Sequence, residues 1–129
     1  MAVTYHIDTD ERVVYLTTAR DSSFVEWREV MMAVLSDPSY RPGFNFLSDR
    51  RQETDVPSTE FARSAAEFLK LNSAKMGGFK WAAVSGDMAI YGMQRMFSIY
   101  SEIKGIEARA FTNYEEALEW VREHPTHSE

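Results

Sequence analysis

Along this chain, segments with the hydrophobic pattern of a β-strand alternate with segments that have the hydrophobic spacing of an α-helix. Short apolar runs, typical of strands, are each followed by a polar or glycine break and then by apolar positions at helical spacing. The runs are Val13 to Ala19, Phe44 to Leu47, Trp81 to Val84 and Ile106 to Phe111. This alternation predicts an α/β protein with a largely parallel sheet and helices packed against it.

A further strand is predicted at the N-terminus. Val3 to Ile7 is rich in β-forming residues, and the polar segment Asp8 to Arg12 separates it from the run Val13 to Ala19. Two such runs around a short polar segment predict an antiparallel hairpin with a longer loop. We therefore expect a single layer of four to five mostly parallel strands that begins with this hairpin.

Four helices are predicted, and each follows a polar residue that can cap it. The capping residues are Ser23, Ser58, Asp87 and Asn113, and Ser23 with Glu26 matches a capping box. The stop signals are Asp37-Pro38, Gly77-Gly78, Lys104-Gly105 and His124-Pro125. The expected buried positions are Phe24, Trp27, Met31 and Val34 in the first helix, Phe61, Ala65, Phe68 and Leu69 in the second, and Ala117, Leu118 and Val121 in the last. Residues 50 to 57, the most polar internal stretch, are expected to form a long loop.

The third helix is unusually apolar. Nine of its residues fall on one arc of about 200° at 100° per residue, which is wider than the usual core-facing stripe. They are Met88, Ala89, Ile90, Met93, Met96, Phe97, Ile99, Tyr100 and Ile103. Three interpretations remain open: burial between the sheet and another helix, a subunit interface, or an apolar pocket beneath the helix. For an interface we expect the exposed flank to be Ile90, Met93 and Phe97.

Composition narrows the class of protein. The 129 residues suit one domain, 1–129, with a core from about residue 3 to residue 123 and a frayed tail at 125–129. The net charge of −6 argues against a nucleic-acid partner. The lack of cysteine excludes disulfides and thiolate chemistry. No run approaches a membrane span and residues 1–20 hold no signal-peptide core, so we expect a cytoplasmic protein without membrane insertion.

Several local segments resemble the SpoIIAA-like (STAS-like) family, in its small stand-alone bacterial branch. They include Ser36 to Asp49, Ala83 to Asp87, Gly92 to Phe97 and Glu115 to Trp120, within a resemblance that covers roughly residues 5–122. The resemblance implies a sheet of four or five strands, built from β-α units, and a regulatory role through protein contacts. It also implies a second class of function, since members of the wider superfamily carry apolar or lipid-like ligands.

The resemblance also implies where a phosphorylated serine could lie. In the anti-sigma-factor antagonists of this fold, that serine starts the second helix, directly after an Asp-Ser-Ser/Thr-Gly turn. Here Asp49 is followed by Arg50-Arg51, and Ser58 and Thr59 come only after the polar loop. We therefore expect that no such phosphorylation switch operates at the second helix.

A candidate binding edge follows from the topology. Ligands of open α/β sheets gather at the carboxyl ends of the strands, where helix N-termini offer free N–H groups. Two arginines at this edge could hold a phosphate or carboxylate. The candidate residues for an anion or other ligand are Asp49, Arg50, Arg51, Ser58, Ser85, Gly86, Asp87 and Asn113. Helix capping alone also explains Ser58, Asp87 and Asn113.

Catalytic and metal signatures are weak. His6, His124 and His127 have no metal-ligand spacing, so no metal site is expected. Ser85-Gly86 lacks the first glycine of a nucleophile elbow and has no suitable histidine after it. Gly77-Gly78 and Gly86 match no phosphate-binding or dinucleotide motif, and we expect no cofactor. The sequence therefore favours a non-catalytic regulatory or protein-interaction module that self-associates as a homodimer, with a binder of a small apolar or lipid-like ligand as the alternative.

Overall fold

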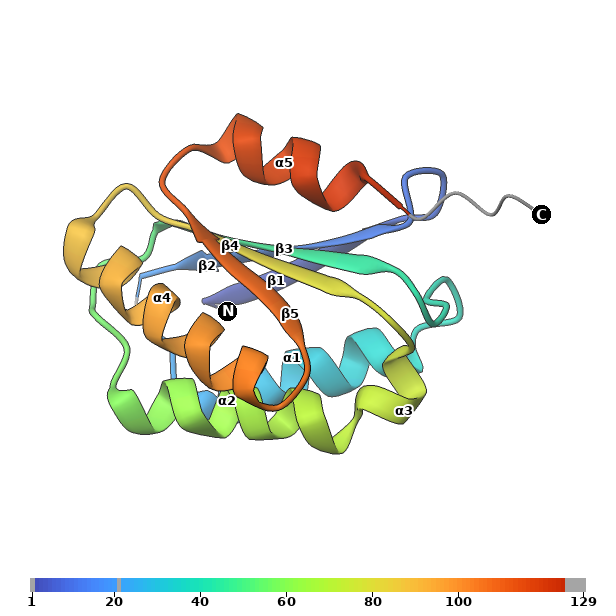
Figure 1. Cartoon of the computed structure of the whole chain (residues 1–129), viewed down its shortest axis with the longest axis horizontal. Helices are drawn as coiled ribbons and strands as arrows, with labels where there is room; N and C mark the ends of the chain where they lie inside the picture. The colour runs from blue at the N-terminus through green and yellow to red at the C-terminus, as the bar shows by residue number, and fades with distance from the viewer. Residues whose placement is uncertain (1, 21, 125–129) are drawn as a thin grey trace.

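The computed structural model describes residues 2–20 and 22–124 and contains one five-stranded sheet flanked by helices (Figure 1). The expected tail, 125–129, lies outside the described residues. The strands are β1 (Val3–Asp8), β2 (Val13–Ala19), β3 (Asn45–Gln52), β4 (Lys80–Val84) and β5 (Glu107–Phe111). The helices are α1 (Phe24–Ser36), α2 (Thr59–Leu71), α3 (Ser73–Met76), α4 (Met88–Ile103) and α5 (Tyr114–Arg122).

The strands lie in the order β1-β2-β3-β4-β5, so the sheet follows the chain from one edge to the other. β1 is antiparallel to β2 and the remaining neighbours are parallel, which confirms the predicted α/β class and the N-terminal hairpin. Helices α1, α2 and α4 cover one face of the sheet, and α5 covers the other (Figure 1). Within the described residues, no helix has the length and apolar character needed to cross a membrane.

β3 is longer than its apolar run predicts. It extends to Gln52 because β2 continues alongside it, with Thr17 opposite Asp49 and Ala19 opposite Gln52 across a shift in register. The expected loop at 50–57 is therefore wrong in its first part, since residues 50 to 52 belong to the strand. The short helix α3, which precedes Gly77, is a second difference from the predicted elements.

All four predicted caps are present. Each side chain accepts a hydrogen bond from a backbone N–H in the first turn of its helix; the residues are Ser23, Ser58, Asp87 and Asn113. The capping box at α1 is only half formed, because the Glu26 carboxylate does not return to Ser23. Instead, its Oε2 accepts from the N–H groups of Ala2 and Val3, at 2.8 and 3.2 Å, and joins α1 to the start of β1.

The main core lies between the sheet and the three helices, and aromatic rings fill its centre. The ring centres of Trp27 and Trp81 are 6.0 Å apart, and Trp81 also stacks on Phe46 at 5.1 Å. Phe68 packs edge-on against Trp27 at 5.4 Å, and Phe97 lies 5.9 Å from Trp81. These contacts join α1, α2, α4, β3 and β4 in one cluster, so each helix is positioned against the same rings.

A smaller core under α5 depends on one buried polar side chain. Asn45, at the start of β3, donates from Nδ2 to the carbonyl of Val121 in α5 at 2.8 Å, and its Oδ1 accepts from the N–H of Lys80 in β4 at 2.8 Å. The Asn45 side chain is buried, its bond to Val121 is shielded from water and its bond to Lys80 is partly shielded, so the amide fixes three elements together. The predicted inward residues of α5, Ala117, Leu118 and Val121, are buried in this core.

We predict that Asn45→Ala lowers the free energy of unfolding by ~2–3 kcal/mol, because it removes the side-chain partner of a buried carbonyl, that of Val121, and of a partly buried N–H, that of Lys80. Asn72→Ala is the matched control, with an expected loss below about 1 kcal/mol. Asn72 also donates to a carbonyl, that of Phe68, but this carbonyl keeps a backbone N–H as a second donor. Urea titration of both variants measures the difference, and equal losses would contradict the role given to Asn45.

Candidate functional site

The predicted polar residues do gather at the carboxyl ends of the strands, but their side chains are already engaged. Asp87 Oδ1 accepts from the N–H groups of Ala89 and Ile90 at 2.9 and 3.0 Å. The buried Ser85 hydroxyl accepts from the N–H of Asp87 at 3.1 Å. The caps Ser58 and Asn113 are similarly bonded to Phe61 and Glu116. Gly86 is exposed between these groups. Capping and turn formation therefore account for the polar character of this edge.

The two arginines of β3 lie on opposite faces of the sheet, as strand geometry requires of neighbours. Arg50 is buried on the side of α1, α2 and α4, where its Nη1 donates to Glu53 Oε2 at 2.8 Å and its guanidinium lies 5.5 Å from the ring centre of Phe61. Arg51 faces α5, where it lies 4.1 Å from the ring centre of Tyr114. The two arginines therefore do not converge on one anion, and an anion held by Arg50 or Arg51 alone with a helix N-terminus stays a prediction.

Arg51 forms the more exposed of the two ion pairs. It donates to both carboxylate oxygens of Asp49, at 2.9 and 2.8 Å. These hydrogen bonds raise the pKa of the Arg51 guanidinium above its ordinary value, against the opposing effect of partial burial. Burial next to Asp49 likewise raises the pKa of Tyr114. Asp49 and Arg51 thus neutralise each other at the surface instead of presenting a free cation.

A small cavity lies under the loop between β3 and α2. Its volume is about 10 Å³, and its lining combines the polar residues Arg50 and Gln94 with aromatic rings. That volume holds roughly one water molecule, and Arg50 and Gln94 offer that water polar partners. The apolar pocket considered beneath the third helix is therefore too small here for an organic ligand.

Helix α4 is turned differently from the expected orientation. Ile90 and Phe97 are 1% and 5% exposed and belong to the core, and Met93 is half-buried against it. The prediction that these three residues form an exposed interface flank is therefore wrong. The reason is that Phe97 packs on Trp81, which directs this side of the helix toward the sheet.

Small and polar residues accompany Phe97 on the inward face of α4. Gln94, Ser98 and Ser101 are buried, although polar side chains of a helix usually lie on its solvent-facing side. Ser98 is satisfied locally, since its hydroxyl donates to the carbonyl of Gln94 at 2.9 Å. Short side chains at 98 and 101 also let α4 lie close to its neighbours α2 and β5.

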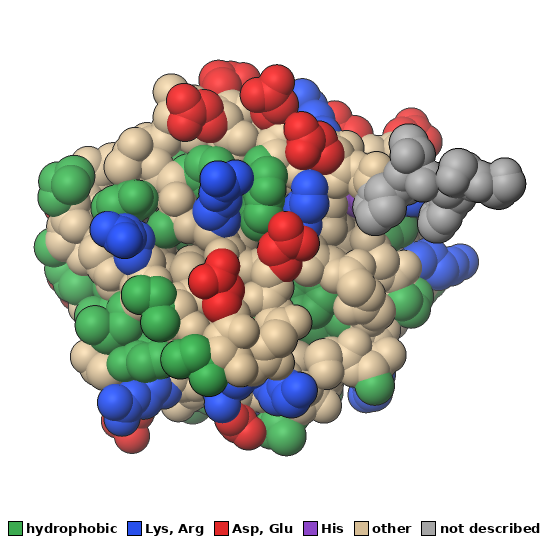
Figure 2. Space-filling model, in the orientation of Figure 1, with side chains coloured by type: hydrophobic (Ala, Val, Ile, Leu, Met, Phe, Trp, Pro, Cys, Tyr) green, Lys and Arg blue, Asp and Glu red, His purple; other side chains and the backbone are tan. Residues whose placement is uncertain are grey.

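The outward face of α4 is consequently apolar and exposed. Met88, Ile99 and Ile103 are 70%, 52% and 78% exposed, and Met96 is also exposed. Figure 2 shows hydrophobic side chains gathered over this helix. Large apolar side chains grouped on one face are typical of contact surfaces, whereas isolated ones are ordinary.

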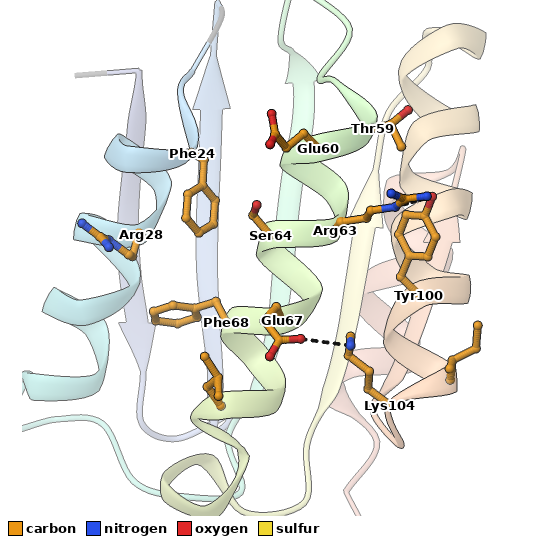
Figure 3. Close-up of a pocket in the computed structure, with 12 residues that line it drawn as sticks. Phe24, Arg28, Thr59, Glu60, Arg63, Ser64, Glu67, Phe68, Tyr100 and Lys104 are labelled. Carbon is orange, nitrogen blue, oxygen red and sulfur yellow. Dashed lines mark hydrogen bonds and ion pairs between the residues drawn. The ribbon is translucent and has the colours of Figure 1, made fainter.

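An open groove borders this face (Figure 3). Its volume is about 1020 Å³, and it runs along the exposed side of α2 between α1 and α4. Phe24 and Arg28 line it from α1, and Tyr100, Ile103 and Lys104 line it from α4. Lys104 Nζ pairs with Glu67 Oε1 at 3.0 Å across the groove, and Arg63 lies over the ring of Tyr100. Leu71, at the end of α2, is 74% exposed.

No protein-family model and no curated protein matches this sequence. Among residues 2–20 and 22–124, no group of three or more His, Asp or Glu side chains is placed to hold a metal ion.

The polar residues that the sequence singled out serve as helix caps, turn residues and ion-pair partners in the structure. The outward face of α4 and the neighbouring groove are the candidate functional surface. The sequence identified the apolar residues of α4, but it did not identify which of them are exposed.

The two neighbouring arginines give a matched test of this description. We predict that Arg50→Met lowers the free energy of unfolding by ~3–5 kcal/mol, because it removes the guanidinium from a buried carboxylate. Arg51→Met should cost less than about 1 kcal/mol, since its side chain is 49% exposed and its ion pair is at the surface. Chemical denaturation of both variants measures this contrast. A loss for Arg51→Met as large as that for Arg50→Met would contradict it.

Proposed function

We propose that this protein is a non-catalytic interaction module of the SpoIIAA-like (STAS-like) kind that self-associates through the outward face of α4. The observation that carries the proposal is the orientation of this helix. It buries Gln94, Ser98 and Ser101 and leaves Met88, Ile99 and Ile103 in water. A helix placed only to complete the core would favour the reverse arrangement.

The free energy of burial supports an interface at this face. Apolar surface removed from water contributes ~25 cal/mol per Å², so covering the exposed side chains of α4 stabilises an assembly by several kcal/mol before the costs of association. A two-fold dimer covers the same patch on both copies and doubles this contribution. Methionine and isoleucine side chains also suit a packed contact between helices.

The carboxyl edge supports the non-catalytic part of the proposal. Its serines, Asp87 and Asn113 are used for caps and turns, and Arg51 is paired with Asp49. The two described histidines contact the N-terminal hairpin instead of this edge: His6 stacks on Tyr15, and His124 bonds to the carbonyl of Glu11. No histidine is therefore available beside Ser85 in the described part of the chain to act as its general base.

The groove over α2 favours a second candidate function, the binding of a small amphipathic ligand. Phe24, Phe68 and Leu71 supply an apolar lining, and Arg28 adds a cation at its rim. The groove is open along its length, so such a ligand would remain partly in water. Native mass spectrometry of the protein from its own cell tests both candidates, because it reports oligomer mass and retained ligand together.

We predict that the wild-type protein sediments as a dimer at micromolar concentration and that Ile99→Asp with Ile103→Asp gives a folded monomer. Both side chains are exposed, so the charges disturb the assembly without entering the core. Val25→Asp is the control: Val25 is 55% exposed on α1 and away from α4, so this variant should remain dimeric. Sedimentation velocity with circular dichroism separates these outcomes, and a monomeric wild type would rule out self-association.

The buried flank provides the complementary prediction. Phe97→Glu should unfold the protein, because it places a carboxylate against Trp81 in the aromatic core. Circular dichroism and intrinsic tryptophan fluorescence report this loss of structure. A folded, monomeric Phe97→Glu variant would instead indicate that Phe97 lies at the dimer interface, and it would contradict the orientation of α4 described above.

A further inference from the structure

The exposed face of α4 has the spacing of a helix-pairing seam. Ala89, Gly92, Met96, Ile99 and Ile103 follow one another at alternating intervals of three and four residues, and all five are exposed. Side chains at these intervals form a single stripe that matches the a and d positions of paired helices. The stripe is directed away from the core, which lies on the side of Ile90 and Phe97.

Side-chain size changes along this stripe. Its N-terminal part is small, with Ala89 and Gly92, and its C-terminal part is large, with Ile99 and Ile103. A Cβ built on Gly92 would meet no atom within 4 Å, so nothing in the monomer requires glycine there. Glycine inside a helix costs roughly 1 kcal/mol relative to alanine. A close approach by another molecule would explain its presence at this position.

We infer that α4 pairs with α4 of a second copy in an antiparallel arrangement, with Ile103 of each copy packed over Gly92 of the other. This inference rests on the self-association proposed above and adds its geometry. Gly92 facing the partner's Ile103 and Met96 facing the partner's Ile99 are centred on the same point of the helix, between Phe97 and Ser98. One two-fold axis therefore serves both contacts, as an isologous interface requires.

The antiparallel arrangement is favoured because it matches small residues with large ones. A parallel pair would place Gly92 opposite itself and Ile103 opposite itself, which leaves a gap at one end and crowding at the other. Antiparallel pairing fills the space over Gly92 with an isoleucine from the partner. It also places the positive end of each helix dipole beside the negative end of the other.

A second observation agrees with this arrangement. Arg63 contacts Tyr100 and Glu67 pairs with Lys104, so α2 and α4 run side by side with a constant offset of 37 residues. Leu71 is therefore level with position 108, about one and a half turns beyond the last residue of α4, Ile103. In the antiparallel dimer the partner's Met88 extends past Ile103 to this same level. Among the described residues, the three most exposed large apolar side chains are Leu71, Met88 and Ile103, and this arrangement brings them together at each end of the interface.

The lack of cysteine in the chain allows a direct test by disulfide trapping. Gly92→Cys and Ile103→Cys are prepared separately and oxidised alone and as an equal mixture. In the antiparallel dimer, identical positions are separated by eleven residues of helix, or about 16 Å. That distance exceeds the roughly 7 Å that a disulfide spans between Cα atoms. Each variant alone should therefore stay uncrosslinked, and the mixture should give a crosslinked dimer.

The outcomes separate this inference from the proposed function. Crosslinking of each variant with itself, but not in the mixed pair, would support self-association and overturn the antiparallel arrangement. A dimeric wild type in which neither the mixture nor a single variant crosslinks would also overturn it. A wild type that sediments as a monomer would overturn both proposals. Reducing and non-reducing gels, with sedimentation of the wild type, give these readouts.

Gly92→Leu provides a second test, because it separates an effect on the stability of the monomer from an effect on dimer affinity. The leucine side chain enters open space in the monomer and favours the helix, so the variant at dilute concentration should unfold at a higher denaturant midpoint than the wild type. It should also weaken the dimer by about tenfold or more, because it occupies the space of the partner's Ile103. A Gly92→Leu protein that dimerises as tightly as the wild type would overturn the proposed contact.

Discussion

The contact between Trp27 and Trp81 holds the helical layer on the sheet. Trp81 lies in β4, between β3 and β5, and touches Phe46 of β3 and Phe97 of α4, while Trp27 brings α1 and the aromatic residues of α2 to the same place. Rings of this size bury a large area and pack only in a few relative orientations. The position of Trp81 therefore decides which side of each helix faces inward, and for α4 that side is the one that carries Phe97.

The orientation of α4 is the observation on which the proposed function rests. Once Phe97 is directed at the sheet, Gln94 and Ser101 are buried with it, and Met88, Ile99 and Ile103 are left in water. Natural sequences usually agree with their fold at every level, and local departures are expected mainly where function requires them. At α4 the departure involves two faces: polar residues lie on the inward face, and apolar residues lie on the outward face, which borders the groove over α2. This arrangement supports the proposed contact surface.

The carboxyl edge of the sheet shows the opposite behaviour. This edge is where open α/β sheets usually bind ligands, yet here its polar groups serve the protein itself. Ser85 and Asp87 shape the turn into α4, Asn113 caps α5, and the ion pair of Arg50 with Glu53 is buried beside the aromatic core. These bonds rigidify the ends of the strands and leave the helical face as the surface that differs from an ordinary domain exterior.

The sequence alone determined the α/β class, the order of the strands and of the four longer helices along the chain, the N-terminal hairpin and all four helix caps. These features depend on local spacing and on side chains that bond within a few residues, such as Ser58 with Phe61 and Asn113 with Glu116. Only the tertiary structure decided the length of β3, because the neighbouring strand β2 supplies its hydrogen bonds as far as Gln52. It also separated Arg50 from Arg51 and chose the inward side of α4. An apolar arc of about 200° leaves that choice open, and only the packing of Phe97 against Trp81, brought together from distant parts of the chain, makes it.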